Sequence, residues 1–365
     1  MSSAETEDRQ EAFSGTKDVI EQHRFDVKKL ESYLAERIEG FRTPLEVRQF
    51  KGGQSNPTYQ LITPNRKYVL RRKPPGKLLP SAHAVDREFK VISALYPTGF
   101  PVAKPYLLCE DESVIGTMFY VMDCVEGRIY WGPLLPDQAP KQRGEIYDAM
   151  NETLARLHQI DYEKIGLADY GKPGNYIARQ ISRWTKQYQL SETETVAEMN
   201  KLIDWLPAHL PPGERSSIVH GDFRLDNMIL HPTEPKVLAV LDWELSTIGD
   251  PLADFTYHLM QWQMPQGGGS AGTQTLLGQD LKALGIPEMS EYVAMYCRRT
   301  GRDETPNMDY YAAYNFFRLA GILQGIIGRV RDGTAANTNA SANPETVKAL
   351  AGAAWYYAKR AGAAD

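Results

Sequence analysis

Cysteine is scarce in this sequence, with three residues in 365. Cys109, Cys124 and Cys297 are odd in number, and no two of them form a Cys-x-x-Cys pair. This argues against a disulfide framework of the kind found in small secreted domains, and it gives no signature of a structural zinc site. We therefore expect a protein of the reducing cytoplasm.

The sequence also lacks an excess of positive charge and long apolar runs. Its formal net charge is −5, which argues against general nucleic-acid binding, because that function favours a basic surface. No apolar run approaches the roughly 20 residues of a membrane span. The first nine residues are polar and acidic, unlike the basic and apolar regions of a signal peptide. We expect neither nucleic acid nor a membrane as a partner.

The most informative stretch is residues 218–244. An apolar pair leads into His-Gly-Asp at 220–222, and Asn227 lies five positions after Asp222. Two short apolar runs, at 228–230 and 237–241, flank a segment rich in turn residues and predict a β-hairpin. Such a hairpin would return Asp242, after its second strand, towards Asn227 at the start of its first.

These side chains suit phosphoryl transfer. A carboxylate on a loop can orient a hydroxyl group and accept its proton, which is the role we predict for Asp222. Mg²⁺ prefers oxygen ligands, so Asn227 and Asp242 are the predicted metal ligands. The reaction then needs little beyond positioning and charge neutralisation. The alternative interpretation is that these are only turn residues exposed to water.

The motif His-Gly-Asp-x-x-x-x-Asn followed by Leu-Asp-Trp-Glu resembles the aminoglycoside phosphotransferase and choline kinase-like family. It is most similar to the kinase-like domain found ahead of some acyl-CoA dehydrogenases, which shares the Asp-Pro-Leu-Ala-Asp continuation at 250–254. The resemblance implies an α+β, bilobal protein-kinase-like fold with a small antiparallel-sheet N-lobe and a mostly helical C-lobe. It also implies ATP and Mg²⁺ as cofactors.

The same resemblance predicts how the chain is divided. Residues 1–25 are expected to be a flexible N-terminus and the start of a first helix. Residues 26–124 would form the N-lobe, with the nucleotide-covering loop and the hinge between lobes. Residues 125–365 would form the C-lobe, with the catalytic loop and the acceptor site.

A glycine-rich turn lies between two predicted strands at 45–50 and 58–62. Adjacent glycines let a backbone approach phosphate closely, although a Gly-Gly turn is often only a hairpin turn. By resemblance to the family's nucleotide-covering loop, five residues are predicted to bind the nucleotide here. They are Gly52, Gly53, Gln54, Ser55 and Asn56.

The next predicted strand, 67–73, has a basic end. By resemblance, Arg71 pairs with the phosphates of ATP, which an arginine can do with two hydrogen bonds. A helix predicted over 81–95 carries Glu88, the candidate partner of Arg71. Solvated side chains are the alternative for both. Arg72 and Lys73 are expected to face either solvent or substrate.

Two short strands are predicted within 114–127, and the second resembles the hinge strand of the family. Backbone groups of a hinge can bond the edge of adenine while apolar side chains sandwich its ring. The predicted residues are Met122, Asp123, Cys124 and Val125. From their types alone, a buried core strand is the alternative.

The remaining sequence predicts a helical C-lobe. Apolar periodicity indicates helices at 143–160, two within 175–210, and others at 290–300, 308–330 and 344–361. By resemblance, Asp250 and Asp254 brace the catalytic loop, and His220 stabilises it. The glycine-rich segment 267–270 is either a lid or a linker.

We therefore expect a small-molecule kinase, a phosphotransferase with an alcohol group as acceptor. Arg224 is a second predicted catalytic residue, which either neutralises transition-state charge or binds an acidic substrate. The resemblance to the dehydrogenase-associated branch makes a hydroxyacyl-CoA the favoured acceptor, and positive residues suit its negative charge. These residues are Arg72, Lys73, Arg224, Arg318 and Arg329. An aminoglycoside, an amino alcohol such as choline, or a non-catalytic nucleotide-binding module are the alternatives.

Overall fold

A computed structural model describes residues 14–51, 56–74, 84–213, 215–265, 275–332 and 343–364. By their internal contacts they form two compact units. The first comprises Met1–Trp131, Glu163–Tyr170 and Leu225–Ser246, and the second Gly132–Tyr162, Gly171–Arg224 and Thr247–Asp365. The division expected after residues 25 and 124 stays a prediction.

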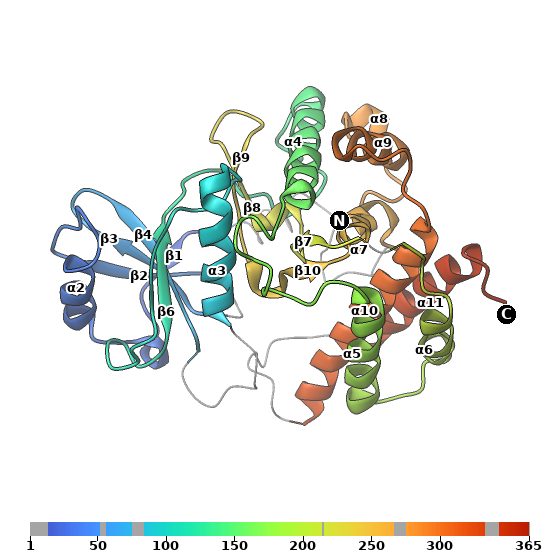
Figure 1. The fold of residues 1–365 in the computed structure, drawn as a ribbon, viewed down its shortest axis with the longest axis horizontal. Coiled ribbons are helices and arrows are strands. Elements are labelled where there is room, and N and C mark those ends of the chain that lie inside the picture. The colour runs from blue at the N-terminus through green and yellow to red at the C-terminus, as the bar shows by residue number, and fades with distance from the viewer. Residues whose placement is uncertain are drawn as a thin grey trace. The chain divides into compact units, whose positions relative to one another are not determined.

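The first unit is built on a six-stranded antiparallel sheet with the order β1-β2-β3-β4-β6-β5 (Figure 1). Its strands are β1 (Thr16–Lys17), β2 (Glu46–Phe50), β3 (Thr58–Ile62), β4 (Lys67–Arg72), β5 (Pro105–Cys109) and β6 (Phe119–Asp123). Strand β5 was not foreseen. The expectation of two strands within 114–127 was wrong, because only β6 forms there. Val114 and Ile115 are apolar because they pack into the core from a turn.

Two α-helices flank this sheet. Helix α2 (Val27–Ala35) begins after Asp26, whose carboxylate caps it by accepting a hydrogen bond of 3.0 Å from the Lys29 amide. Leu30 and Leu34 of α2 are buried in the core of the sheet. Helix α3 (Val85–Leu95) packs against β5 and β6 and ends in a 3-10 turn, Tyr96–Thr98. A second such turn, Glu21–His23, precedes α2.

The predicted hairpin is present and belongs to the first unit. Strands β8 (Met228–Leu230) and β9 (Val237–Val240) pair antiparallel, with 3-10 turns at Leu225–Asn227 and Trp243–Leu245 on either side. The Arg128 and Leu230 backbones exchange two hydrogen bonds of 2.8 Å. A Cβ atom at Gly127 would overlap the Leu230 carbonyl, so glycine is required for this close approach.

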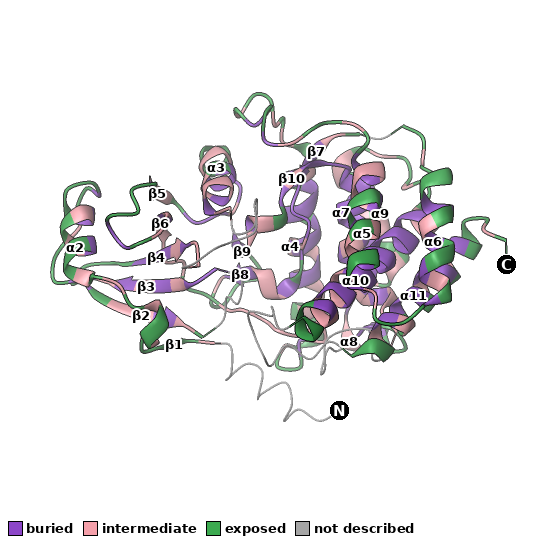
Figure 2. Ribbon diagram, turned by 90° about the horizontal axis from the view of Figure 1, so that it is seen from below, coloured by how far each residue is buried: buried purple, intermediate pink, exposed green. Residues whose placement is uncertain are grey.

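The second unit is mainly helical. Its short strands β7 (Ser217–Val219) and β10 (Thr247–Gly249) pair antiparallel. Its helices are α4 (Pro140–Gln159), α5 (Tyr176–Ser191), α6 (Ala197–Ala208), α7 (Pro251–Gln263), α8 (Leu281–Leu284), α9 (Met289–Thr300), α10 (Met308–Arg331) and α11 (Pro344–Arg360). Helices α5, α6 and α11 are buried on one side and exposed on the other, as their apolar periodicity predicts (Figure 2).

Helix α7 was not foreseen, and its burial explains why. Asp250 caps it and Pro251 occupies its first position, both of which favour a helix start. Most of its residues are buried, so it lacks the exposed stripe that marks an amphipathic helix. The segment 267–270, a predicted lid or linker, lies outside the described residues. Among the residues that the structure describes, no helix combines the length and apolarity that crossing a bilayer requires.

Candidate active site

Arg71 and Glu88 form the expected ion pair within the first unit. Arg71 lies on β4 and Glu88 on α3, and the Arg71 Nε lies 3.1 Å from Oε2 of Glu88. The Glu88 side chain is buried, and Tyr120 on β6 donates a hydrogen bond of 3.1 Å to the same Oε2. A buried charge is costly unless it is paired, so this contact holds α3 against the sheet.

Asn56 adds a third donor to Glu88. Its buried side-chain amide donates a hydrogen bond of 3.0 Å to Oε1. The end of the predicted nucleotide-covering loop is thereby tied to the Arg71–Glu88 pair. Gly52, Gly53, Gln54 and Ser55 lie outside the described residues, so their contact with phosphate stays a prediction.

Charge and burial compete at the ion pair. Burial raises the pKa of Glu88, and Arg71 and the Tyr120 hydroxyl oppose that rise. Burial also acts to lower the pKa of Arg71, but Glu88, Tyr120 and Asp242 outweigh it, so the pKa of Arg71 is raised. Arg71 therefore remains a cation at every ordinary pH.

Asp242 joins the same group through the hairpin. Its Oδ1 accepts a hydrogen bond of 3.0 Å from Nη2 of Arg71. The residue follows β9 with φ +64°, in the left-handed region. The Leu241 amide donates a hydrogen bond of 2.8 Å to the Asn227 carbonyl, so the hairpin returns Asp242 towards Asn227 as predicted.

Asn227 and Asp242 offer a donor set that fits Mg²⁺. One amide oxygen and one carboxylate meet the usual pattern of one or two protein oxygens completed by phosphates and water. The Asp242 side chain is 32% exposed, so a ligand arriving from solvent can reach it. Their role as metal ligands stays a prediction.

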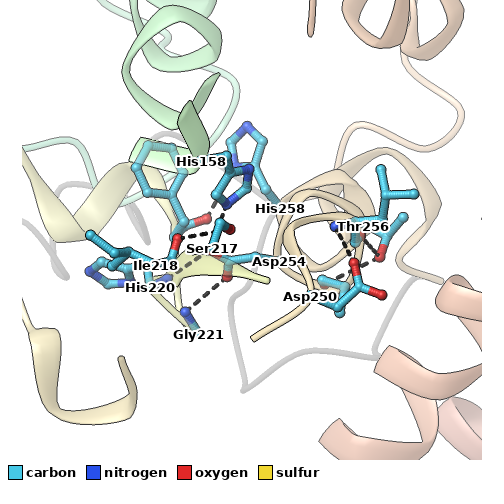
Figure 3. A network of polar contacts seen from close by, with 12 residues as sticks. His158, Ser217, Ile218, His220, Gly221, Asp250, Asp254, Thr256 and His258 are labelled. Carbon is cyan, nitrogen blue, oxygen red and sulfur yellow. Dashed lines mark hydrogen bonds and ion pairs between the residues drawn. The ribbon is translucent and has the colours of Figure 1, made fainter. Parts of the chain in front are cut away.

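In the second unit, the His-Gly-Asp motif follows β7 and is held by Asp254 of α7. The carboxylate of Asp254 accepts hydrogen bonds of 2.7 Å from the His220 amide and 2.8 Å from the Gly221 amide (Figure 3). His158 lies 3.2 Å from Oδ2 of the same carboxylate. Asp254 thus braces the loop, as the family resemblance implied.

Asp250 does not share this role. Its Oδ1 accepts from the Leu252 amide at 2.8 Å, and its Oδ2 accepts from the Tyr311 hydroxyl at 2.6 Å. The expectation that Asp250 braces the catalytic loop was wrong, because the side chain is used to cap α7. His220 behaves as expected: its buried ring accepts a hydrogen bond of 3.2 Å from the Asp222 amide.

The carboxylate of Asp222 is surrounded by donors. The Tyr257 hydroxyl donates to Oδ1 at 2.6 Å, and Nε of Arg224 lies 2.9 Å from the same oxygen. Burial acts to raise the pKa of Asp222, but Arg224 and Tyr257, with help from His220 and Arg318, hold the pKa below its ordinary value. Asp222 is therefore ionised at neutral pH and able to accept a proton.

Tyr257 was missed by the sequence reasoning. No motif surrounds it, and α7 itself was not predicted. Its one available signal is spacing: Tyr257 follows Asp254 by three positions, which places the two side chains on one face of a helix. Both reach residues 220–222.

Two of the residues expected to carry spare positive charge are used within their own units. Arg72 is buried and donates to the carbonyls of His23 at 2.9 Å and Ile115 at 3.2 Å. Arg318 is buried on α10 and donates to the Gly221 carbonyl at 2.7 Å. The expectation that Arg72 faces solvent or substrate was wrong, and the charge of Arg318 is not spare.

The four predicted hinge residues lie at the end of β6 and just beyond it. Met122 pairs with Val69 and Asp123 with Tyr68, so the strand is fixed against β4. All four residues, Met122 to Val125, are half-buried, unlike the fully buried stretch of β6 before them. Contact with adenine stays a prediction.

The arrangement offers two chemical capabilities. The first unit holds a cation, Arg71, beside two carboxylates and an amide. The second holds an ionised carboxylate, Asp222, with Arg224 beside it. The chain passes from one set to the other between Arg224 and Leu225. A carboxylate base, a cation for phosphate and oxygen ligands for a metal are what phosphoryl transfer to a hydroxyl group requires.

Curated relatives match nearly the whole chain. Acyl-CoA dehydrogenase family member 10 of Mus musculus is 46% identical over 337 residues, which cover 91% of this chain and 31% of that protein. Acyl-CoA dehydrogenase family member 11 of Rattus norvegicus is 44% identical over 345 residues, 92% of this chain and 44% of that protein. The chain thus spans less than half the length of these relatives.

Solved structures share the fold. A provisionally assigned aminoglycoside phosphotransferase from Ralstonia eutropha is 51% identical, with a TM-score of 0.83 over 92% of this chain and 99% of that one. An aminoglycoside phosphotransferase in a ternary complex with ADP and hygromycin B is 15% identical, with a TM-score of 0.58 over 93% and 99%. The expected α+β, bilobal kinase-like fold is confirmed. The model of the phosphotransferase enzyme family matches residues 46–311, and the chain belongs to that family.

Proposed function

We propose that this chain is an ATP- and Mg²⁺-dependent small-molecule kinase that transfers the γ-phosphoryl group to an acceptor hydroxyl. The observation that carries the proposal is the state of Asp222. Its backbone neighbours are fixed by Asp254, and its carboxylate is kept ionised by Arg224 and Tyr257. A carboxylate held in this way suits a group that orients a hydroxyl and takes its proton.

The remaining roles follow from charge and donor type. Arg71 binds the phosphates of ATP while Glu88 fixes its direction. Asn227 and Asp242 hold Mg²⁺, which when bound neutralises charge on the phosphates. Gly52 to Asn56 cover the nucleotide, and Met122 to Val125 contact its base. Arg224, whose side chain is 52% exposed, stabilises the charge of the transferred group.

A hydroxyacyl-CoA remains the favoured acceptor. Its support is the similarity to relatives named as acyl-CoA dehydrogenase family members. Arg72 and Arg318 no longer contribute to that argument, because both are buried and bonded within their own units. Lys73, which lies 3.7 Å from Asp86, Arg224, which lies 2.9 Å from Asp222, and Arg329 stay in the proposal on their charge alone.

An aminoglycoside is the second candidate. The specific observation in its favour is the shared fold with a phosphotransferase solved with hygromycin B. An aminoglycoside is polycationic, so it would need a surface rich in carboxylates. The two candidates therefore differ in the charge that the acceptor site must carry.

The test measures ADP formation from Mg-ATP with a panel of acceptors: hydroxyacyl-CoAs that differ in hydroxyl position, aminoglycosides and choline. Turnover on one class identifies the acceptor. Asp222→Asn should then lower turnover by roughly 10²–10⁴-fold, while calorimetry finds ATP affinity nearly unchanged. Asp303→Asn, at an exposed aspartate of the same unit, is the matched control and should keep full turnover.

Two results would contradict the proposal. Undiminished turnover in Asp222→Asn would remove the base from the mechanism. Tight binding of Mg-ATP without turnover on any acceptor would favour a non-catalytic nucleotide-binding module.

A further inference from the structure

Tyr257 connects helix α7 to the carboxylate of Asp222. Its hydroxyl donates a hydrogen bond of 2.6 Å to Oδ1. Asp254, one turn earlier on the same helix, binds the His220 and Gly221 amides. One helix face therefore fixes both the backbone before Asp222 and the side chain of Asp222 itself.

Arg318 of α10 also contacts Tyr257. Its guanidinium carbon lies 4.9 Å from the centre of the Tyr257 ring, and its Nη2 donates to the Gly221 carbonyl at 2.7 Å. The Arg318 side chain is 6% exposed, so this contact is shielded from water. A cation over a desolvated aromatic face is attracted to it, and the ring is thereby held in place.

Arg224 also contacts Oδ1 of Asp222, but Arg224 and Tyr257 differ in how firmly each is held in place. The Arg224 side chain is 52% exposed, and exposed ion pairs are weak and screened by salt. Tyr257 is partly buried and packed against Arg318. Tyr257 is therefore the partner that keeps the carboxylate oriented when Arg224 moves.

We propose that Tyr257 is the positioning residue for the base Asp222, with Arg318 holding the Tyr257 ring. The proposal rests on the kinase function above. It places no chemistry on Tyr257: the hydroxyl keeps its proton and orients the oxygen that it bonds. It also favours the ionised form of Asp222, because a hydrogen bond donated to a carboxylate stabilises the charge.

Tyr257→Phe tests the proposal, since it removes the hydroxyl and keeps the ring against Arg318. We expect kcat to fall by roughly tenfold, short of the 10²–10⁴-fold typical for loss of a base, with little change in KM for the acceptor. The acid limb of the pH–rate profile should move to higher pH, because Asp222 loses a group that favours its charged form.

Tyr311→Phe is the matched control. It removes an equally short hydroxyl–carboxylate bond, to Asp250, on the capping side of α7. It should lower the melting temperature and leave the acid limb where it is. A merely structural role for Tyr257 predicts the same pattern for Tyr257→Phe, and that result would overturn the proposal. A raised KM with an unmoved acid limb would also overturn it, by placing Tyr257 on the acceptor.

A second measurement separates this proposal from the kinase function. Carbon-13 NMR of the aspartate carboxyl groups follows the titration of Asp222, assigned by the resonance that Asp222→Asn removes. Tyr257→Phe should shift this titration to higher pH even in a protein that turns over no acceptor. If the Asp222 titration is not shifted in Tyr257→Phe, the proposed role of Tyr257 is wrong. If the titration is shifted but no acceptor is turned over, only the kinase function is wrong.

Discussion

Arg71 bonds both Glu88 and Asp242, although 171 positions of the chain separate Arg71 from Asp242. Nε and Nη2 of Arg71 lie 3.1 Å from Glu88 and 3.0 Å from Asp242. Within the described residues, one positive charge thus serves two carboxylates, which leaves a surplus negative charge at the end of the hairpin. A divalent cation at Asn227 and Asp242 would offset it.

Asp242→Asn tests this surplus charge. Removal of the Asp242 charge should weaken Mg-ATP binding by roughly tenfold or more, since metal affinity is sensitive even to changes around the ligands. Binding of ATP in EDTA should be unchanged or tighter, because one negative charge near the phosphates is gone. Calorimetry with and without Mg²⁺ measures the two affinities. Glu234→Gln, in the exposed turn of the same hairpin, is the control, and equal effects of both variants would contradict the metal role.

Glu88→Ala should destabilise the protein by about 3–5 kcal/mol, because it leaves Arg71, whose side chain is only 11% exposed, without its principal partner. The matched control is Glu126→Ala, which breaks a pair with Lys67 at the start of β4 in the same sheet. The Glu126 and Lys67 side chains are 69% and 46% exposed, so the loss of this pair should leave the stability nearly unchanged. Urea denaturation followed by circular dichroism compares the two. Similar small losses would show that the Arg71–Glu88 pair does not hold α3.

Gly221→Ala should strain the catalytic loop. Gly221 has φ +83°, which side chains disfavour at a cost of roughly 1–3 kcal/mol. The loop cannot relax freely, because Asp254 binds the Gly221 amide and Arg318 binds its carbonyl. We expect a lower melting temperature and a loss of turnover. Gly352→Ala in α11 is the control: a Cβ there meets no atom within 4 Å, and the change should stabilise the helix by about 0.5–1 kcal/mol.

The hairpin was predicted from a local sequence signal, and the Arg71–Glu88 pair from the family resemblance. Two apolar runs around a turn specify a hairpin, whereas Arg71 and Glu88 taken alone would be interpreted as solvated side chains, and only the resemblance paired them. Alternation along the strand also explains the error at Arg72. Consecutive residues of a strand point to opposite faces, so Arg71 and Arg72 cannot share one site. Arg72 instead lies over the Phe25 and Tyr59 rings.

Tyr257 and Arg318 had no comparable signal. Tyr257 belongs to a helix that is buried on most sides. Arg318 lies on the largely apolar helix α10, where the sequence pattern alone predicts that a single arginine faces solvent. Their partners are 35 and 97 positions away in the chain, and such distant contacts follow only from the fold.

His258 should make stability depend on pH. Its buried ring donates from Nδ1 to the Phe223 carbonyl at 3.0 Å and accepts at Nε2 from the Tyr292 hydroxyl at 2.8 Å. Burial lowers the pKa of His258 from 6.5 to about 4. Between these two pKa values the unfolded chain therefore binds more protons than the folded one. The contribution of His258 to the free energy of unfolding is at its full value above pH 6.5 and falls as the pH drops towards 4. The shift corresponds to about 3 kcal/mol.

Thermal denaturation between pH 4 and 7 measures this dependence. His258→Gln should lower stability at neutral pH, where the two hydrogen bonds are lost, and flatten the slope in the acid range. His209→Gln, at an exposed histidine of the same unit, is the control and should keep the full slope. An unchanged slope in His258→Gln would assign the acid sensitivity to other groups. If the slope does flatten, the carbonyl next to Asp222 is held by a neutral imidazole, and acid acts on the catalytic loop through Phe223 as well as through Asp222 itself.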